Sequence, residues 1–248
     1  MKSMRNLILA SLLLGGMFTF TACDSEPSAK DISRVTYFPT FEFEGGDFSI
    51  VPCGTDYTLP PVKATENGVE LPVTTEIEGA FFGSPTFDVN SADKYVITSS
   101  ATNADGFDGL VTRTVLVACT GDLVNSLEGL YRATVVRNGV VSAQYQNLEY
   151  VIIKKVGPNQ YQLSDAIGGY YAIGRAYGDA YNASGMVITA NNIPANDFSF
   201  SGPVGVGAFG GALTMSDFDV NPENGTITFT SVWDAGFTFV VTLTQVPI

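Results

Sequence analysis

The chain has 248 residues, of which 45% are hydrophobic and 15% are charged, a composition typical of one large or two ordinary globular domains. Its net charge of −13 repels nucleic-acid phosphates, so we expect no nucleic-acid partner. The chain has 0 histidines, which removes the commonest general base and zinc ligand, and we therefore expect a protein that is not an enzyme.

Residues 1–22 have the parts of a secretion signal. Lys2 and Arg5 form a positive start, and an apolar run from Leu7 to Leu14 follows. The whole apolar stretch ends near Ala22, which makes it short for a membrane span of roughly 20 residues. We therefore expect residues 1–22 to be removed on export.

The segment after this run resembles the processing site of bacterial lipoproteins. Phe20-Thr21-Ala22-Cys23 is similar to the lipobox, and the resemblance implies that Cys23 carries a lipid that holds the protein on a membrane. Residues 23–31 are polar and contain a proline, which predicts a flexible tether. The acidic residues that follow Cys23 resemble the signal that sends lipoproteins of the Bacteroides group to the outer surface of the outer membrane, with a plain solvated linker as the alternative.

Residues 32–119 predict an Ig-like β-sandwich in an all-β chain. Apolar and polar residues alternate with period two, and turn residues recur at short intervals. Asn67-Gly68 and Asp105-Gly106 supply hairpin turns. About seven short strands in this length are typical of the immunoglobulin fold. The expected strands are 35–38, 48–51, 69–71, 73–77, 94–98 and 110–118.

Four stretches of this region carry a family resemblance. Residues 54–64, 94–97, 101–106 and 113–117 are similar to the bacterial Ig-like domain of Bacteroides-group lipoproteins. The central strand of that domain reads Tyr-x-Val-x-Tyr-x-Ala-x-Asn, and Ser99 stands at its second aromatic position. The resemblance implies a spacer or adhesion module without catalysis.

Two cysteines flank the Ig-like region. In such a sandwich the early edge strand that ends near Cys53 can run beside the last strand, which ends at Cys119. A disulfide would persist in an exported protein, and two buried free thiols are the alternative. No Cys-x-x-Cys spacing is present, so we expect no metal or redox centre at these residues.

Residues 127–248 predict a second β domain, which a short joint at residues 120–126 separates from the first. The pattern indicates an antiparallel meander, closed as a β-barrel or folded as a flattened β-sandwich. Gly129-Leu130-Tyr131 and residues 151–165 resemble the C-terminal domain that follows the Ig-like one in the same lipoproteins, a domain with no assigned chemistry. The expected strands are 149–156, 161–163, 170–177, 186–190, 198–200, 212–218, 226–233 and 237–244.

The candidate ligand-binding residues are aromatic and polar side chains of this second domain. Flat rings match the apolar faces of sugars, and charged or amide groups match sugar hydroxyls. The alternative is that these rings fill a β core. Since Tyr170 and Tyr171 are neighbours in an expected strand, we expect them to face opposite sides. The candidate rings are Tyr170, Tyr171, Tyr177, Tyr181 and Trp233, and the candidate polar partners are Arg175, Asp179, Asn182 and Asp234.

Two acidic turns and one glycine-rich stretch complete the candidates. Residues 88–93 and 103–109 hold several side-chain oxygens, which makes calcium possible, although turn chemistry alone explains such residues. We expect no other cofactor and no other metal. Residues 202–211 are rich in glycine and predict a mobile loop.

The leading functional interpretation is a non-catalytic cell-envelope lipoprotein that helps to capture polysaccharide at the outer surface, as accessory lipoproteins of polysaccharide-utilisation systems do. One alternative is a structural or adhesion module that binds another envelope protein. A third is a carrier of a small apolar ligand, which requires a closed barrel with a hollow interior.

Overall fold

The computed structural model describes residues 35–248. The expected signal peptide, Cys23, the tether and the first residues of the Ig-like region lie outside the described residues. Every strand of the described residues lies within Phe38–Ile248, which forms one compact unit. Among residues 35–248 the regular structure is β-strands and short 3-10 turns, and no helix has the length and apolar character that crossing a bilayer requires.

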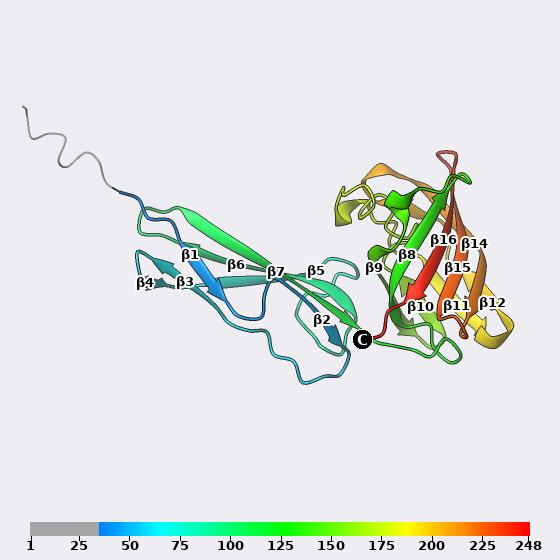
Figure 1. The fold of residues 1–248 in the computed structure, drawn as a ribbon, viewed down its shortest axis with the longest axis horizontal. Helices are drawn as coiled ribbons and strands as arrows, with labels where there is room; N and C mark the ends of the chain where they lie inside the picture. The colour runs from blue at the N-terminus through cyan, green and yellow to red at the C-terminus, as the bar shows by residue number, and fades with distance from the viewer. Residues whose placement is uncertain (1–34) are drawn as a thin grey trace, which may run out of the picture. The chain divides into compact units, whose positions relative to one another are not determined.

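The first domain is a sandwich of two sheets, as the Ig-like pattern predicts (Figure 1). Buried and half-buried residues alternate along β6 (Asp93–Thr102), so one side of this strand faces the interior of the sandwich. The smaller sheet contains β1 (Thr40–Phe43), β3 (Val62–Glu66) and β4 (Val69–Leu71). The larger sheet has the order β2 (Phe48–Pro52), β7 (Asp108–Ala118), β6 (Asp93–Thr102) and β5 (Thr74–Gly79).

One strand expectation in this domain is wrong, and two strands were missed. Residues 35–38 are not a strand, because β propensity alone makes none without a partner strand, and Val35 and Phe38 are exposed. Strands β1 and β3 are present although the pattern did not predict them.

Cys53 and Cys119 form a disulfide in the structure, the first of the two alternatives that the sequence left open. Strands β2 and β7 run parallel, and their register pairs Pro52 with Ala118. The next residue of each strand is a cysteine, so the two Cα atoms lie 4.7 Å apart. The bridge thus joins the ends of two neighbouring strands of one sheet.

The second domain is one antiparallel sheet of nine strands that curls into a half-barrel (Figure 1). Of the two expected forms, a closed barrel and a flattened sandwich, the sheet is nearer to the barrel, although it stays open with β12 and β13 at its edges. The order is β12 (Asp197–Phe200), β11 (Val187–Asn192), β10 (Gln160–Leu163), β9 (Leu148–Gly157), β8 (Gly129–Arg137), β16 (Phe237–Gln245), β15 (Thr226–Trp233), β14 (Gly210–Asn221) and β13 (Val204–Val206).

The concave side of the half-barrel is filled by the connection between β10 and β11, residues 164–186, which we name the inner segment. A Cβ atom on Gly168 would lie 2.7 Å from Val241 Cγ1 and 2.9 Å from Val135 Cγ2, so the backbone itself contacts the sheet. Ser231 Oγ of β15 donates a hydrogen bond of 2.6 Å to the carbonyl oxygen of Ala166. The segment is therefore part of the core.

The inner segment contradicts the strand expected at residues 170–177, where the structure has consecutive turns. Gly168 and Gly169 both have positive φ angles, which end extended structure. The buried carboxylate of Asp165 accepts hydrogen bonds from the backbone N–H groups of Ile167, Gly169 and Ala183. Because these backbone N–H groups already have a hydrogen-bond acceptor inside the segment, they do not require the carbonyl groups of a neighbouring strand.

Candidate ligand-binding site

The candidate residues of the second domain gather at one end of the half-barrel. The register pairs Arg137 with Phe239 and Trp233 with Phe237, so the β8–β9 and β15–β16 connections leave the sheet at the same end. Leu213 pairs with Trp233, which brings the β13–β14 connection there as well. Aromatic side chains from these connections and from the inner segment contact one another.

Three of the five predicted rings fill the core. Tyr170, Tyr171 and Trp233 are 2%, 6% and 8% exposed, so both neighbouring tyrosines are buried, whereas the sequence predicted that they face opposite sides of a strand. That expectation assumed a strand, and in consecutive turns neighbouring side chains need not alternate. Tyr145 stacks on Tyr170 with ring centroids 4.0 Å apart, and Tyr171 meets Trp233 edge to face.

The remaining rings form a surface that we name the aromatic platform: Tyr177, Tyr181 and Phe209. Tyr177 and Phe209 are 47% and 46% exposed, and Tyr181 is half-buried between them. The ring centroids lie 5.2 Å apart for Tyr177 and Tyr181, 4.8 Å for Tyr181 and Phe209, and 6.3 Å for Tyr177 and Phe209.

Phe209 is the member that the sequence did not predict. It lies in the glycine-rich stretch expected to be a mobile loop, which the structure instead has as β13, the 3-10 turn η5 (Gly207–Phe209) and the start of β14. A Cβ atom on Gly207 would lie 2.4 Å from the carbonyl oxygen of Ala180, so η5 touches the 3-10 turn η3 (Asp179–Tyr181). The glycine permits this contact and thereby brings Phe209 to Tyr181.

Two arginines border these rings. The Arg137 guanidinium lies 5.0 Å from the centroid of Tyr170, and that of Arg175 lies 5.7 Å from the same centroid. Hydrogen bonds with the hydroxyls of Tyr170, Tyr177 and Tyr145 raise the pKa of Arg175 above its usual value. Within residues 35–248 the ion pairs join Lys94 to Asp179 and Arg132 to Glu149, so no described carboxylate neutralises Arg137 or Arg175.

The other predicted polar residues are divided between surface and core. Asp234 is exposed next to Trp233, and the carboxylate of Asp179 is engaged by Lys94 at 2.6 Å. Asn182 is buried, and among the described residues neither its Nδ2 nor Trp233 Nε1 has a hydrogen-bond partner. Arg175 and Asp234 are therefore the predicted polar side chains that remain available at the surface.

Several side-chain oxygens of the two acidic turns accept hydrogen bonds from the protein itself, among them Asn103 Oδ1, which accepts from the backbone N–H groups of Asp105 and Phe107. Asp88 Oδ1 accepts from the backbone and the side chain of Asn90. The carboxylate of Asp93 is buried and accepts from four backbone N–H groups, those of Phe81, Phe82, Ser84 and Lys94. Residues 35–248 contain no group of three or more acidic, cysteine or histidine residues that could hold a metal ion.

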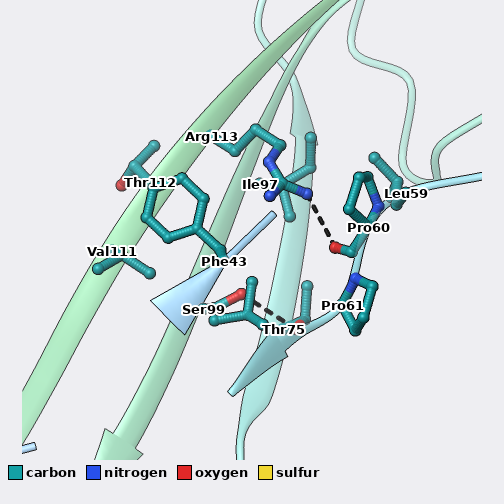
Figure 2. Close-up of a pocket in the computed structure, with 11 residues that line it drawn as sticks. Phe43, Leu59, Pro60, Pro61, Thr75, Ile97, Ser99, Val111, Thr112 and Arg113 are labelled. Atoms are coloured by element: carbon teal, nitrogen blue, oxygen red, sulfur yellow. Dashed lines mark hydrogen bonds between the residues drawn. The ribbon is translucent and has the colours of Figure 1, made fainter. Parts of the chain in front are cut away.

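A second candidate site, which the sequence did not predict, lies in the Ig-like domain. The site is a cavity of about 180 Å³. Figure 2 shows aliphatic and proline side chains around it and the guanidinium of Arg113 at one end. The lining residues come from both sheets and from the segment that leads into β3.

Comparison with protein families places both domains. A family model for the Ig-like domain of bacterial surface proteins matches residues 41–117. A second family model, which describes a C-terminal domain, matches residues 120–245, just over half of the chain. The chain belongs to this second family.

A solved structure shows what kind of protein the chain resembles. The chain is similar to the crystal structure of the lipoprotein BT2262 from Bacteroides thetaiotaomicron, with 26% sequence identity and a TM-score of 0.60. The match covers 84% of this chain and 100% of the BT2262 chain. No curated protein matches the chain significantly. The predicted resemblance to Bacteroides-group surface lipoproteins with an Ig-like domain and a C-terminal β domain is confirmed. The expectation that the chain is a lipid-anchored envelope protein is consistent with these matches.

Proposed function

We propose that this surface lipoprotein is a non-catalytic accessory protein that binds carbohydrate at the aromatic platform, on the outer face of the outer membrane. The observation that carries the proposal is the pair of half-exposed rings, Tyr177 and Phe209, supported by Tyr181. Exposed and contiguous apolar rings are costly in water, and they are typical of surfaces that bind something.

The dimensions of the platform suit sugar rings. A pyranose ring presents an apolar face that lies flat on an aromatic ring, and the Tyr177 and Phe209 rings, with centroids 6.3 Å apart and planes inclined at 63°, offer two contact faces to one sugar residue. The exposed guanidinium of Arg175 lies beside the hydroxyl of Tyr177 and supplies donors for sugar hydroxyls at the edge of the rings. Asp234 supplies acceptors on the neighbouring turn.

The apolar-carrier alternative receives less support. A carrier needs an empty interior, whereas the inner segment packs against the concave side of the sheet with Ala166, Ile167 and Tyr170 fully or nearly buried. The alternative of adhesion to another envelope protein is an outcome of the experiment below.

The test is a glycan-array screen of the mature soluble chain, residues 24–248, followed by titration of the best glycan. We expect the double variant Tyr177→Ala/Phe209→Ala to bind that glycan at least tenfold more weakly, since each lost ring contact removes about 1 kcal/mol. Trp233→Ala is unsuitable as the test variant because that ring is part of the core.

The matched control is Phe107→Ala, which removes a ring that is 50% exposed in the Ig-like domain. It should leave glycan binding unchanged. If no glycan is retained, or if the double variant and the control bind equally well, carbohydrate binding at the platform is refuted. Capture of a single envelope protein by the wild type in place of a glycan would instead favour adhesion.

A further inference from the structure

The cavity of the Ig-like domain differs from the platform in position, shape and chemistry. It lies between the two sheets and has a volume of about 180 Å³. Figure 2 shows the ring of Phe43 along one side and the prolines at 60 and 61 along the other. The lining is Phe43, Leu59, Pro60, Pro61, Val62, Thr75, Ile97, Ser99, Val111, Thr112 and Arg113.

The small side chain of Ser99 leaves this space open. Tyr95, Ile97, Ser99 and Ala101 are among the buried residues along the inward side of β6, and Ser99 is only 2% exposed. Its hydroxyl lies 3.3 Å from the hydroxyl of Thr75.

The guanidinium of Arg113 places a buried positive charge at the other end of the cavity. Arg113 is 5% exposed and donates to the carbonyl oxygens of Gly46 at 3.0 Å, Pro60 at 2.8 Å and Glu44. A guanidinium has five N–H donors, so these three bonds leave two. No described carboxylate forms an ion pair with it, and an uncompensated buried charge favours an anionic partner.

The volume limits what fits. An apolar cavity of about 150 Å³ in another protein holds one benzene molecule, so about 180 Å³ accommodates one six-membered ring with a small substituent. Aliphatic and proline walls disfavour a polyhydroxylated sugar, whose hydroxyls would lose their hydrogen bonds to water.

We propose that this cavity binds a small molecule made of one flat apolar ring and a carboxylate. The ring lies between Phe43 and Ile97, in the space beside the small side chain of Ser99, and the carboxylate lies at Arg113. This site acts independently of carbohydrate binding at the platform.

The test uses benzoate as the probe, titrated into the mature soluble chain by calorimetry, with chemical shifts of the Ile97 and Val111 methyl groups to locate it. Benzamide has the same ring without the charge, and acetate has the charge without the ring. We expect saturable binding of benzoate with shifts at both methyl groups, and binding of benzamide and acetate at least tenfold weaker.

Two variants at position 99 complete the test. Ser99→Tyr fills the cavity and should abolish benzoate binding while the thermal midpoint is equal to or higher than that of the wild type. Ser99→Ala keeps the cavity open and should retain binding. The proposal is overturned if the wild type does not bind benzoate, if benzamide binds equally well, or if Ser99→Tyr, shown to be folded by circular dichroism, binds as tightly as Ser99→Ala.

Discussion

Removal of the Cys53–Cys119 disulfide is expected to destabilise the Ig-like domain by about 4 kcal/mol. The perturbation is the double variant Cys53→Ala/Cys119→Ala, which avoids placing hydroxyl groups among the apolar neighbours of the two half-buried cysteines. The bridge spans a sequence separation of 66 residues, and a cross-link over such an interval lowers the entropy of the unfolded chain by an amount that corresponds to this value.

The single tryptophan of the chain makes the assay specific for each domain. Trp233 lies in β15 of the second domain, so its fluorescence reports unfolding of the half-barrel alone. Far-UV circular dichroism reports the strands of both domains. With an m-value of about 2 kcal/mol per molar urea, the loss corresponds to a shift of about 2 M in the midpoint of the Ig-like transition.

We therefore expect the double variant to unfold in two steps by circular dichroism, while its fluorescence midpoint stays near that of the wild type. Reducing agent should lower the midpoint of the wild type and leave the double variant unchanged. A loss smaller than about 1 kcal/mol in the Ig-like transition would refute the argument from chain entropy, because strand pairing alone would then hold residues 53 and 119 together.

Two further predictions concern the inner segment. Burial raises the pKa of Asp165 to about 7, although three backbone N–H groups oppose this shift. Between about pH 4 and pH 7 the folded state therefore holds a proton that the unfolded state has already lost. The free energy of unfolding is highest below pH 4 and falls by on the order of 4 kcal/mol as the pH rises through 7. Urea titrations followed by Trp233 fluorescence should show this fall in the wild type and not in Asp165→Asn; parallel pH profiles of the two proteins would contradict it. Gly168→Ala should cost about 2–4 kcal/mol in the same assay, from a positive φ and overpacking against Val135 and Val241. The control Gly139→Ala has a positive φ of 73° but no atom within 4 Å of the added Cβ, and an equal cost for both variants would show that the inner segment is not packed inside the sheet.

Local chemistry made much of the fold predictable. Residues 226–233 were expected as a strand and are β15, because alternating apolar residues over that length suit a half-buried strand. The turn at Asn67-Gly68 was expected from residues that tolerate positive φ, and both have positive φ between β3 and β4. The disulfide was among the alternatives that the sequence offered, because the two cysteines end strands that the Ig-like arrangement brings together.

The candidate sites were only partly predictable. The sequence indicated that aromatic residues of the second domain gather, but not that Tyr170, Tyr171 and Trp233 are buried while Tyr177 is exposed. Phe209 was missed because its position depends on contact between two turns that are far apart in the sequence, at Gly207 and Ala180.

By itself the sequence determined the all-β class, the turn positions and the resemblance to surface lipoproteins, because these depend on residues near one another along the chain. Only the tertiary structure decided that the second sheet curls around the inner segment, which rings reach the surface and that a cavity opens beside Ser99. Exposure and empty volume depend on how distant segments pack, and alternation along a single strand carries no information about the side chains that will face it.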